Sequence, residues 1–449
     1  KKYLLDKYKK DKITDDEIKR ITKNFTLLST SNLYESNKKF IKYVTDGFLL
    51  KRDDETKKDI LIELIDYSNE DKNDYKIVNQ LEIRGYETRI PDLILYVNGL
   101  PLVVFEFKSA IREEATLHDA YRQLLVRYKR DIPELLKFNA FCVISDGINT
   151  KMGSCFSNYE FFYAWRKINE TDLIEKEGVD SLYSMINGLF DKNRLKEVLS
   201  SFIFFPDVNK NNEKIICRYP QFYAAINLYK SIIKNRHPYG DGRGGTYSGA
   251  TGSGKSFIML FLTRLLMKSL DFQNPTIIII TDRNDLDDQI SKQFINAKNF
   301  IGDDNIINVN DRNELSDLLK NRKSGGVFLT TIQKFSEGTE LLSNRDNIVC
   351  ISDEAHRSQL NLDKKILINK NEIRESYGFA KYLHNSFPKA TYVGFTGTPI
   401  DATLNVFGEV VDTYTMLDSV KDKITVPIVY EGRSAKVILD NKKLEEIDS

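Results

Sequence analysis

"PDLILYVNGLPLVVFEFKS", residues 91–109, is an apolar stretch that carries three charged side chains, Asp92, Glu106 and Lys108. Its remaining residues favour burial in a sheet, and burying a charge costs free energy unless the charge is paired. The stretch therefore indicates that the three charged groups meet one another in the folded chain.

Residues 93–97 and 102–107 are typical of two strands, and the Asn-Gly dipeptide between them tolerates the positive φ of a tight turn. A three-residue loop, residues 98–100, would place Asp92 directly opposite Glu106. A two-residue loop would send the glutamate to the other face of the sheet, because one step of slip flips every side chain. We therefore predict the three-residue loop.

Lys108 lies two residues beyond Glu106 and so faces the same side. Two converging carboxylates repel each other, and a divalent cation such as Mg²⁺, which prefers oxygen ligands, holds both ionised. A neighbouring lysine would orient water and stabilise charge on a phosphate, as metal-assisted phosphodiester hydrolysis requires. Asp92 and Glu106 are thus candidate metal ligands. The alternative is an edge strand with a salt bridge from Glu106 to Lys108 or Arg112.

Apolar residues keep helical spacing from Leu117 to Tyr128, which predicts a helix beside the hairpin, with Gln123 off its apolar stripe as a supporting site residue. "FNAFCVISDG", residues 138–147, then indicates a buried return strand. A hairpin, a helix and a return strand with carboxylates at the strand edge resemble the core of PD-(D/E)xK nucleases.

"SGATGSGKS", residues 248–256, matches the phosphate-binding pattern GxxxxGK[ST]. The glycines let backbone N–H groups surround the phosphates of ATP, Lys255 reaches the β- and γ-phosphates, and Ser256 ligates Mg²⁺. The expected ATP-binding residues in this loop are Gly249, Thr251, Gly252, Ser253, Gly254, Lys255 and Ser256.

"NIVCISDEAHRS", residues 347–358, places the acidic pair Asp353 and Glu354 directly after an apolar strand. Asp353 is expected to complete the Mg²⁺ shell, and Glu354 to polarise the attacking water as a catalytic residue. Apolar runs alternate with helical stretches from the glycine-rich loop onward, which predicts a doubly wound parallel α/β sheet covered on both faces.

Five segments resemble, in sequence order, motifs I, Ia, Ib, II and III of superfamily 2 helicases: "SGATGSGKS" (248–256), "IIIITDRNDLDDQI" (277–290), "FLTTIQKF" (328–335), "ISDEAHRS" (351–358) and "YVGFTGTPI" (392–400). With "RYPQ" (218–221) and the nuclease-like hairpin and "VISDG" (143–147) in front, the chain resembles the R subunit of a type I restriction-modification enzyme. The likeness runs from about residue 75 to about residue 432.

The resemblance implies an ATP-dependent DNA translocase and endonuclease with a restriction-endonuclease-like domain followed by a RecA-like P-loop domain. It implies that Asp92, Glu106 and Lys108 cleave DNA and that Gln221 recognises adenine. Residues implied to couple nucleotide state to DNA grip are Thr396, Gly397 and Thr398. Residues implied to approach the DNA backbone are Thr281, Asp282, Arg283, Thr330 and Thr331, for which helix capping after a strand is the alternative.

The chain departs from the family pattern on the helix after the hairpin. The family has a tyrosine four residues after the glutamine, whereas Arg127 stands there and Tyr128 comes five residues after Gln123. Five residues turn a regular α-helix about 140° past one full turn, so the two side chains would not share a face. Either a local bulge restores the pair or Tyr128 belongs to the core, and we predict the core.

We expect a nuclease domain at 1–205, a polar linker at 206–214, a first motor domain at 215–430, and at 431–449 the start of a connection to a second motor domain. Because few residues follow "TGTP", we expect a fragment of the full subunit that binds ATP weakly and hydrolyses it poorly.

The scattered cysteines and the absence of a long apolar run favour a cytoplasmic protein without a membrane span, and the net charge of +1 does not bear on DNA binding. The implied partners are double-stranded DNA and the methyltransferase and specificity subunits. The rival hypotheses are a remodelling motor with an inactive, structural nuclease domain and a nucleotide-gated scaffold without turnover.

Overall fold

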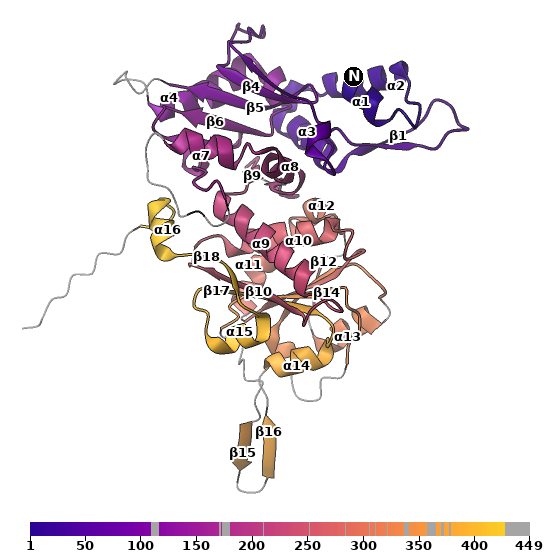
Figure 1. Cartoon of the computed structure of the whole chain (residues 1–449), viewed down its shortest axis with the longest axis vertical. Helices are drawn as coiled ribbons and strands as arrows, with labels where there is room; N and C mark the ends of the chain where they lie inside the picture. Colours follow the sequence, from indigo (N-terminus) through magenta and orange to yellow (C-terminus); the bar gives the residue numbers. More distant parts are fainter. Residues whose placement is uncertain are drawn as a thin grey trace, which may run out of the picture.

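The computed structural model describes residues 1–426 apart from 109–115, 170–171, 173–179, 210, 251, 283, 305, 310, 321, 336–340, 357–364, 370–371 and 377–378. Figure 1 shows two lobes, which we call the N-terminal lobe (1–205) and the C-terminal lobe (215–426). No helix among these described residues is long and apolar enough to span a membrane.

The N-terminal lobe is built on a five-stranded sheet of order β3-β4-β5-β6-β7. Only the β5–β6 pair is parallel, and the other neighbours are antiparallel. The strands of the sheet are β3 (Tyr75–Asn79), β4 (Leu93–Val97), β5 (Leu100–Phe107), β6 (Phe141–Ser145) and β7 (Thr150–Gly153), and a separate hairpin pairs β1 (Phe48–Leu50) with β2 (Ile60–Ile62). The α-helices are α1 (Lys2–Lys7), α2 (Asp15–Thr26), α3 (Leu33–Asp46), α4 (Leu117–Arg122), α5 (Lys129–Asp131), α6 (Pro133–Leu136), α7 (Asp180–Gly188) and α8 (Lys192–Ser201).

The hairpin of β4 and β5 turns on two residues rather than three. Asn98 and Gly99 form the turn with φ of 52° and 81°, and Val97 pairs directly with Leu100. The predicted three-residue loop is therefore wrong, because Asn-Gly satisfies the two positive φ values of the tighter turn.

A bulge at Leu102 restores the register that the site needs. The pairing shifts by one residue between Leu95 and Tyr96. On the side of this shift away from the turn, Leu93 lies opposite Phe105. Continued by one step, this register places Asp92 across from Glu106. The expected facing of the two carboxylates is thus reached through a bulge in β5 instead of a longer loop.

The C-terminal lobe holds a seven-stranded sheet of order β12-β13-β11-β14-β17-β10-β18. Every pair is parallel, as the near-continuous apolar runs predicted. The strands are β10 (Arg243–Gly249), β11 (Thr276–Thr281), β12 (Ile306–Asn308), β13 (Val327–Thr331), β14 (Ile348–Ser352), β17 (Thr391–Thr396) and β18 (Val410–Tyr414). Two of them, β12 and β18, form the sheet edges and were not predicted.

Helices cover both faces of this sheet. Figure 1 shows α9 and α10 on the side toward the N-terminal lobe and α14 and α15 on the opposite side. The helices are α9 (Tyr219–Asn235), α10 (Lys255–Lys268), α11 (Asn284–Ile295), α12 (Lys298–Ile301), α13 (Arg312–Lys320), α14 (Phe379–Ser386), α15 (Asp401–Phe407) and α16 (Met416–Lys421), and a small hairpin pairs β15 (Lys365–Asn369) with β16 (Glu372–Ser376). The predicted doubly wound α/β architecture is confirmed.

The segment expected to be a linker, residues 206–214, runs between the paired strands β8 (Ile203–Phe204) and β9 (Ile215–Ile216). Its last residue, Lys214, is buried and donates hydrogen bonds to Asn37 Oδ1 (3.0 Å) and to the carbonyl oxygen of Asn139 (2.7 Å). The end of the segment is therefore buried in the N-terminal lobe, so the segment is not a fully solvated linker.

Candidate active sites

The candidate nuclease site begins with Asp92, which directly precedes β4. Its Oδ2 accepts a hydrogen bond from the backbone N–H of Phe107 (2.7 Å), and its Oδ1 accepts one from Gln80 Nε2 (3.2 Å). The aspartate is half-buried. A backbone contact from the neighbouring strand thus fixes the carboxylate at the edge of the sheet, and Gln80 is a contributor that the sequence reasoning missed.

Four side chains form a closed ring of hydrogen bonds beside Asp92. Lys108 Nζ donates to Glu106 Oε1 (2.6 Å) and to Gln123 Oε1 (3.1 Å). Gln123 Nε2 donates to the hydroxyl of Tyr128 (2.9 Å), and that hydroxyl donates to Glu106 Oε2 (2.8 Å). Both oxygens of the glutamate are therefore held, one by the lysine and one by the tyrosine.

The ring closes because the helix is locally underwound into a wider turn. Residues Gln123–Tyr128 form a π-helix between α4 and α5, and a π-turn brings side chains five residues apart onto one face. Tyr128 is 1% exposed, so its ring does belong to the core, but its hydroxyl reaches the site. The prediction of a purely core role for Tyr128 is wrong, and the local bulge that was the alternative is present.

Burial dominates the electrostatics of Glu106, whose side chain is 1% exposed. Burial raises the pKa of this carboxyl, Lys108 lowers it, and the charge of Asp92 raises it again. The ionised glutamate is thus only partly compensated by the lysine. An additional cation between Glu106 and Asp92 would relieve the remaining cost, so the donor set fits a hard divalent ion with oxygen ligands.

No group of three or more histidine, cysteine, aspartate or glutamate side chains that could hold a metal occurs among the described residues. The nuclease site offers two carboxylates, Asp92 and Glu106, and Mg²⁺ commonly binds through one or two carboxylates while keeping several waters. The arrangement is compatible with that mode of binding.

The phosphate-binding loop follows β10 and leads into α10. Gly252 and Gly254 have φ of 80° and 85°, a conformation that glycine adopts without strain. Lys255 Nζ lies 3.5 Å from the carbonyl oxygen of Gly249 and 3.5 Å from Glu354 Oε1. Ser256 follows in the first turn of α10, whereas Thr251 lies outside the described residues.

The acidic pair lies at the carboxyl end of β14, two strands away from the loop in the sheet. Asp353 is 8% exposed, and its Oδ1 has no hydrogen-bond partner among the described residues. Burial, then the charge of Glu354, raises the pKa of Asp353 to about 6. A buried carboxylate oxygen without a partner, beside the phosphate-binding loop, fits a divalent cation.

Gln221 and Arg218 pack against the loop from the start of α9. Arg218 donates through Nη2 to the carbonyl oxygen of Ser253, and its backbone N–H donates to Gln221 Oε1 (2.9 Å). A Cβ at Gly254 would lie only 2.6 Å from Gln221 Nε2. The structure thus brings Gln221 to the loop as expected, and it adds Arg218, which the sequence reasoning left without a role.

The "TGTP" segment contacts the acidic pair through a histidine. His356 Nδ1 lies 2.7 Å from Thr396 Oγ1 and 3.4 Å from Glu354 Oε2, and the N–H of Thr398 donates to Thr396 Oγ1 (3.1 Å). Gly397 lies close to the end of β10, since a Cβ there would be 3.4 Å from Gly249 O. His356 was missed, although its place in "DEAH" was the available signal.

The residues expected to touch the DNA backbone lie at the carboxyl ends of β11 and β13. The side chains of Thr281, Thr330 and Thr331 are at most 3% exposed, and only Asp282 is half-buried. Arg283 lies outside the described residues. The three threonine side chains do not reach the surface in this conformation, so their contact with DNA stays a prediction.

Two family models match the chain. Residues 220–449 match the SWI2/SNF2 ATPases, and residues 2–161 match the type I restriction enzyme R protein N terminus (HSDR_N). The first defines the class of the C-terminal lobe as a SWI2/SNF2 ATPase domain, in agreement with its parallel sheet and phosphate-binding loop.

Relatives that align with nearly all of this chain agree with both models. The type I restriction enzyme HindI endonuclease subunit of Haemophilus influenzae is 37% identical over 96% of this chain and 41% of its own length. A Methanocaldococcus jannaschii relative, which bears the name MjaIXP endonuclease subunit, is 31% identical over 96% of this chain and 42% of its own length. The type I restriction enzyme SsaAORF53P endonuclease subunit of Staphylococcus saprophyticus is 25% identical over 93% of the chain.

The chain belongs to the SWI2/SNF2 ATPase family, whose model covers its C-terminal half, and its N-terminal region matches the N terminus of type I restriction enzyme R proteins. It spans about two fifths of the length of the curated relatives that it matches. The expected kinship with the restriction subunit is thereby confirmed.

Proposed function

We propose that this chain is the nuclease and first motor portion of a type I restriction subunit, which uses ATP to translocate double-stranded DNA and cleaves it in a Mg²⁺-dependent reaction. The observation that carries the proposal is the closed ring of Glu106, Lys108, Gln123 and Tyr128 beside Asp92. A structural domain without catalysis has no need to bury Glu106 opposite a second carboxylate and to pair it with a lysine that reaches solvent.

In the nuclease half, Asp92 and Glu106 would hold Mg²⁺, which when bound activates water and polarises the scissile phosphate. Lys108 has a side chain 20% exposed, so it reaches solvent from one side while its Nζ binds Glu106. It can stabilise negative charge on a DNA phosphate. Gln123 and Tyr128 are positioning residues, because they act on the glutamate and the lysine and not on DNA.

In the motor half, the backbone of residues 249–256 would surround the phosphates of ATP, with Lys255 and the start of α10 supplying positive charge. Ser256 and Asp353 would hold Mg²⁺, and Gln221 would contact adenine. Glu354 would polarise the attacking water. Its ion pair with Lys255 holds it beside the phosphate-binding loop until the γ-phosphate competes for the lysine.

Coupling to DNA would run through the contact between Thr396 and His356. The threonine ends β17, the histidine contacts Glu354, and residues 397–398 are exposed next to the phosphate-binding strand. A change at the γ-phosphate can therefore move the exposed "TGTP" turn through two hydrogen-bonded side chains. That turn and residues 281–283 and 330–331 would in turn contact DNA, which links the γ-phosphate to the DNA grip.

The partners that we propose are double-stranded DNA and the methyltransferase and specificity subunits. Their support is the family: the relatives are endonuclease subunits of type I restriction enzymes. The proposed location is the cytoplasm, where such a complex meets DNA. Residues 1–449 alone are expected to bind ATP weakly and to turn it over slowly, and robust DNA-stimulated hydrolysis by the isolated chain would contradict this.

The test is plasmid cleavage and ATP hydrolysis by the reconstituted complex that contains the complete subunit. Asp92→Ala is expected to abolish cutting and leave ATP hydrolysis intact, whereas Lys255→Ala is expected to abolish both. Asp74→Ala, an exposed carboxylate on the same lobe, serves as the matched control for the first change. Cutting that survives Asp92→Ala would favour the rival remodelling motor with a structural nuclease domain.

A further inference from the structure

Gln80, the residue that directly follows β3, lies beside the candidate nuclease site. The register of β3 with β4, continued by one step past its last pair, brings Gln80 opposite Asp92, and the N–H of Gln80 donates to the carbonyl oxygen of Asp92 (3.2 Å). The register of β4 with β5 places Glu106 across from Asp92 on the other side. Asp92 thus stands between a glutamine and a glutamate in one row across the sheet, where directly opposite side chains are neighbours.

The side chain of Gln80 completes the hydrogen bonds that fix the Asp92 carboxylate. The N–H of Phe107 donates to Oδ2 (2.7 Å), and Gln80 Nε2 donates to Oδ1 (3.2 Å). An ionised carboxylate only accepts hydrogen bonds, so the amide of the glutamine presents its nitrogen to Asp92. With one donor on each oxygen, the carboxylate cannot rotate without breaking one of the two bonds.

The backbone of Gln80 points to a role in the site rather than in the fold. Its φ is 50°, in the left-handed region that residues with a Cβ adopt only at a cost in free energy. The residue is exposed, and a hydrogen bond open to competition from water adds little to folding stability. The strained conformation is therefore better explained by what the side chain does for Asp92.

We infer that Gln80 is a positioning residue for Asp92, whose amide fixes the orientation in which the aspartate offers its oxygens to a divalent cation shared with Glu106. The inference rests on the proposed function, because it requires that these two carboxylates bind Mg²⁺. Groups that hydrogen-bond to a metal ligand typically contribute about tenfold to a hundredfold to metal affinity or activity. The lower end of this range applies here, since Phe107 still holds Oδ2 when the glutamine is lost.

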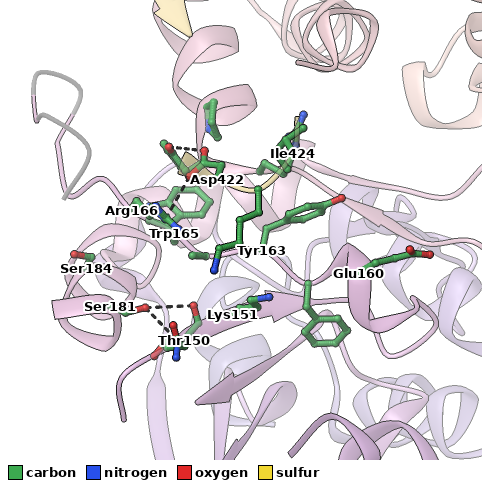
Figure 2. A pocket seen from close by; sticks show the side chains of 17 residues that line it. Thr150, Lys151, Glu160, Tyr163, Trp165, Arg166, Ser181, Ser184, Asp422 and Ile424 are labelled. Atoms are coloured by element: carbon green, nitrogen blue, oxygen red, sulfur yellow. Dashed lines mark hydrogen bonds and ion pairs between the residues drawn. The ribbon is translucent and has the colours of Figure 1, made fainter. Parts of the chain in front are cut away.

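The place of Gln80 in the sheet keeps its substitution away from the contact between the lobes. The strand β3 forms one edge of the five-stranded sheet, and β7 forms the other. Figure 2 shows the cavity of about 120 Å³ where the lobes meet, which is lined by Thr150 and Lys151 of β7 and by Asp422, the residue after α16. Because Gln80 follows the opposite edge strand, ATP hydrolysis by the motor lobe is an internal reference that its substitution should leave unchanged.

The direct measurement is Mn²⁺ binding to the chain, followed by the electron paramagnetic resonance signal of the free ion. All samples carry Asp353→Ala, which removes the candidate metal ligand of the motor lobe. Gln80→Gly removes the side chain and suits the positive φ, and Gln80→Met keeps a side chain of similar length without a donor. Both variants are expected to weaken Mn²⁺ binding about tenfold.

Gln273→Gly is the matched control. Gln273 is an exposed glutamine with φ of 47° in the turn between α10 and β11, so its substitution should leave the affinity for Mn²⁺ unchanged. Asp92→Ala is expected to abolish binding. If Asp92→Ala has no effect, the proposed metal site fails and the inference fails with it. If Asp92→Ala abolishes binding while both Gln80 variants bind Mn²⁺ as the unsubstituted chain does, the inference alone is overturned.

DNA cleavage by the reconstituted complex separates positioning of Asp92 from contact with DNA. Positioning predicts that both Gln80 variants raise the Mg²⁺ concentration for half-maximal cleavage about tenfold and approach the wild-type rate at saturating Mg²⁺, with DNA affinity and ATP hydrolysis unchanged. Variants that weaken DNA binding and keep the wild-type dependence on Mg²⁺ would show that Gln80 contacts DNA, and this result would overturn the inference.

Discussion

Replacing Tyr128 by phenylalanine removes one hydroxyl from the candidate nuclease site and keeps the buried ring. The hydroxyl donates to Glu106 Oε2 (2.8 Å) and accepts from Gln123 Nε2 (2.9 Å). Without it, one oxygen of a carboxylate that is 1% exposed loses its donor, and the glutamine that supports Lys108 loses its acceptor.

The expected size of the effect follows from the type of hydrogen bond lost. A hydrogen bond to a charged group contributes about 1.5–3 kcal/mol, and about 1.4 kcal/mol corresponds to a factor of ten. Lys108 still holds Oε1, so the loss should lie near the lower end of that range. We expect the DNA cleavage rate at saturating Mg²⁺ to fall about tenfold, with ATP hydrolysis by the same complex unchanged.

The matched control is Tyr121→Phe. Tyr121 lies on α4 and donates its hydroxyl to the carbonyl oxygen of Ser157 (3.2 Å), away from the site. The assay follows plasmid cleavage and ATP hydrolysis in the same sample of reconstituted complex. If both variants cleave at the wild-type rate, or if both lose cleavage and ATP hydrolysis together, the ring does not position the nuclease residues and the reasoning fails.

Two further predictions concern the loop and the linker. Gly254→Ala should weaken binding of a fluorescent ATP analogue by at least about tenfold more than Gly252→Ala. Both residues have positive φ, but only at Gly254 would the Cβ, 2.6 Å from Gln221 Nε2, displace the side chain that is proposed to contact adenine. Equal losses would contradict this. Burial lowers the pKa of Lys214 from 10.5 to about 8, so the unfolded chain binds more protons between those pH values and the free energy of unfolding should rise with pH across that window, by roughly 3 kcal/mol at most. In chemical denaturation, Lys214→Met should remove this rise, and an unchanged slope would show that the buried lysine does not titrate there.

The sequence predicted the motor sheet well because its signals are local. Apolar runs, glycines in the phosphate-binding loop and acids after a strand are each readable from neighbouring residues. The edge strands β12 and β18 escaped because they are short or partly exposed, so their apolar pattern is weak.

The nuclease site was harder to predict because two irregularities shape it. The bulge at Leu102 and the π-helix at Gln123–Tyr128 each insert one residue into a regular element. Period-two and 3.6-residue reasoning assume regular elements, so they gave the correct facing of Asp92 and Glu106 with the wrong loop, and they excluded Tyr128 from the site. The five-residue spacing between Gln123 and Tyr128 was the visible sign of the second irregularity.

The central claim is that Asp92 and Glu106 share one divalent cation. The most direct measurement is an anomalous difference map from crystals of the chain soaked with Mn²⁺. The account predicts a peak bonded to both carboxylates at about 2.0–2.2 Å, and its loss in crystals of Asp92→Ala. A map with Mn²⁺ only beside Asp353, or with no peak between Asp92 and Glu106 at a saturating concentration, would contradict it.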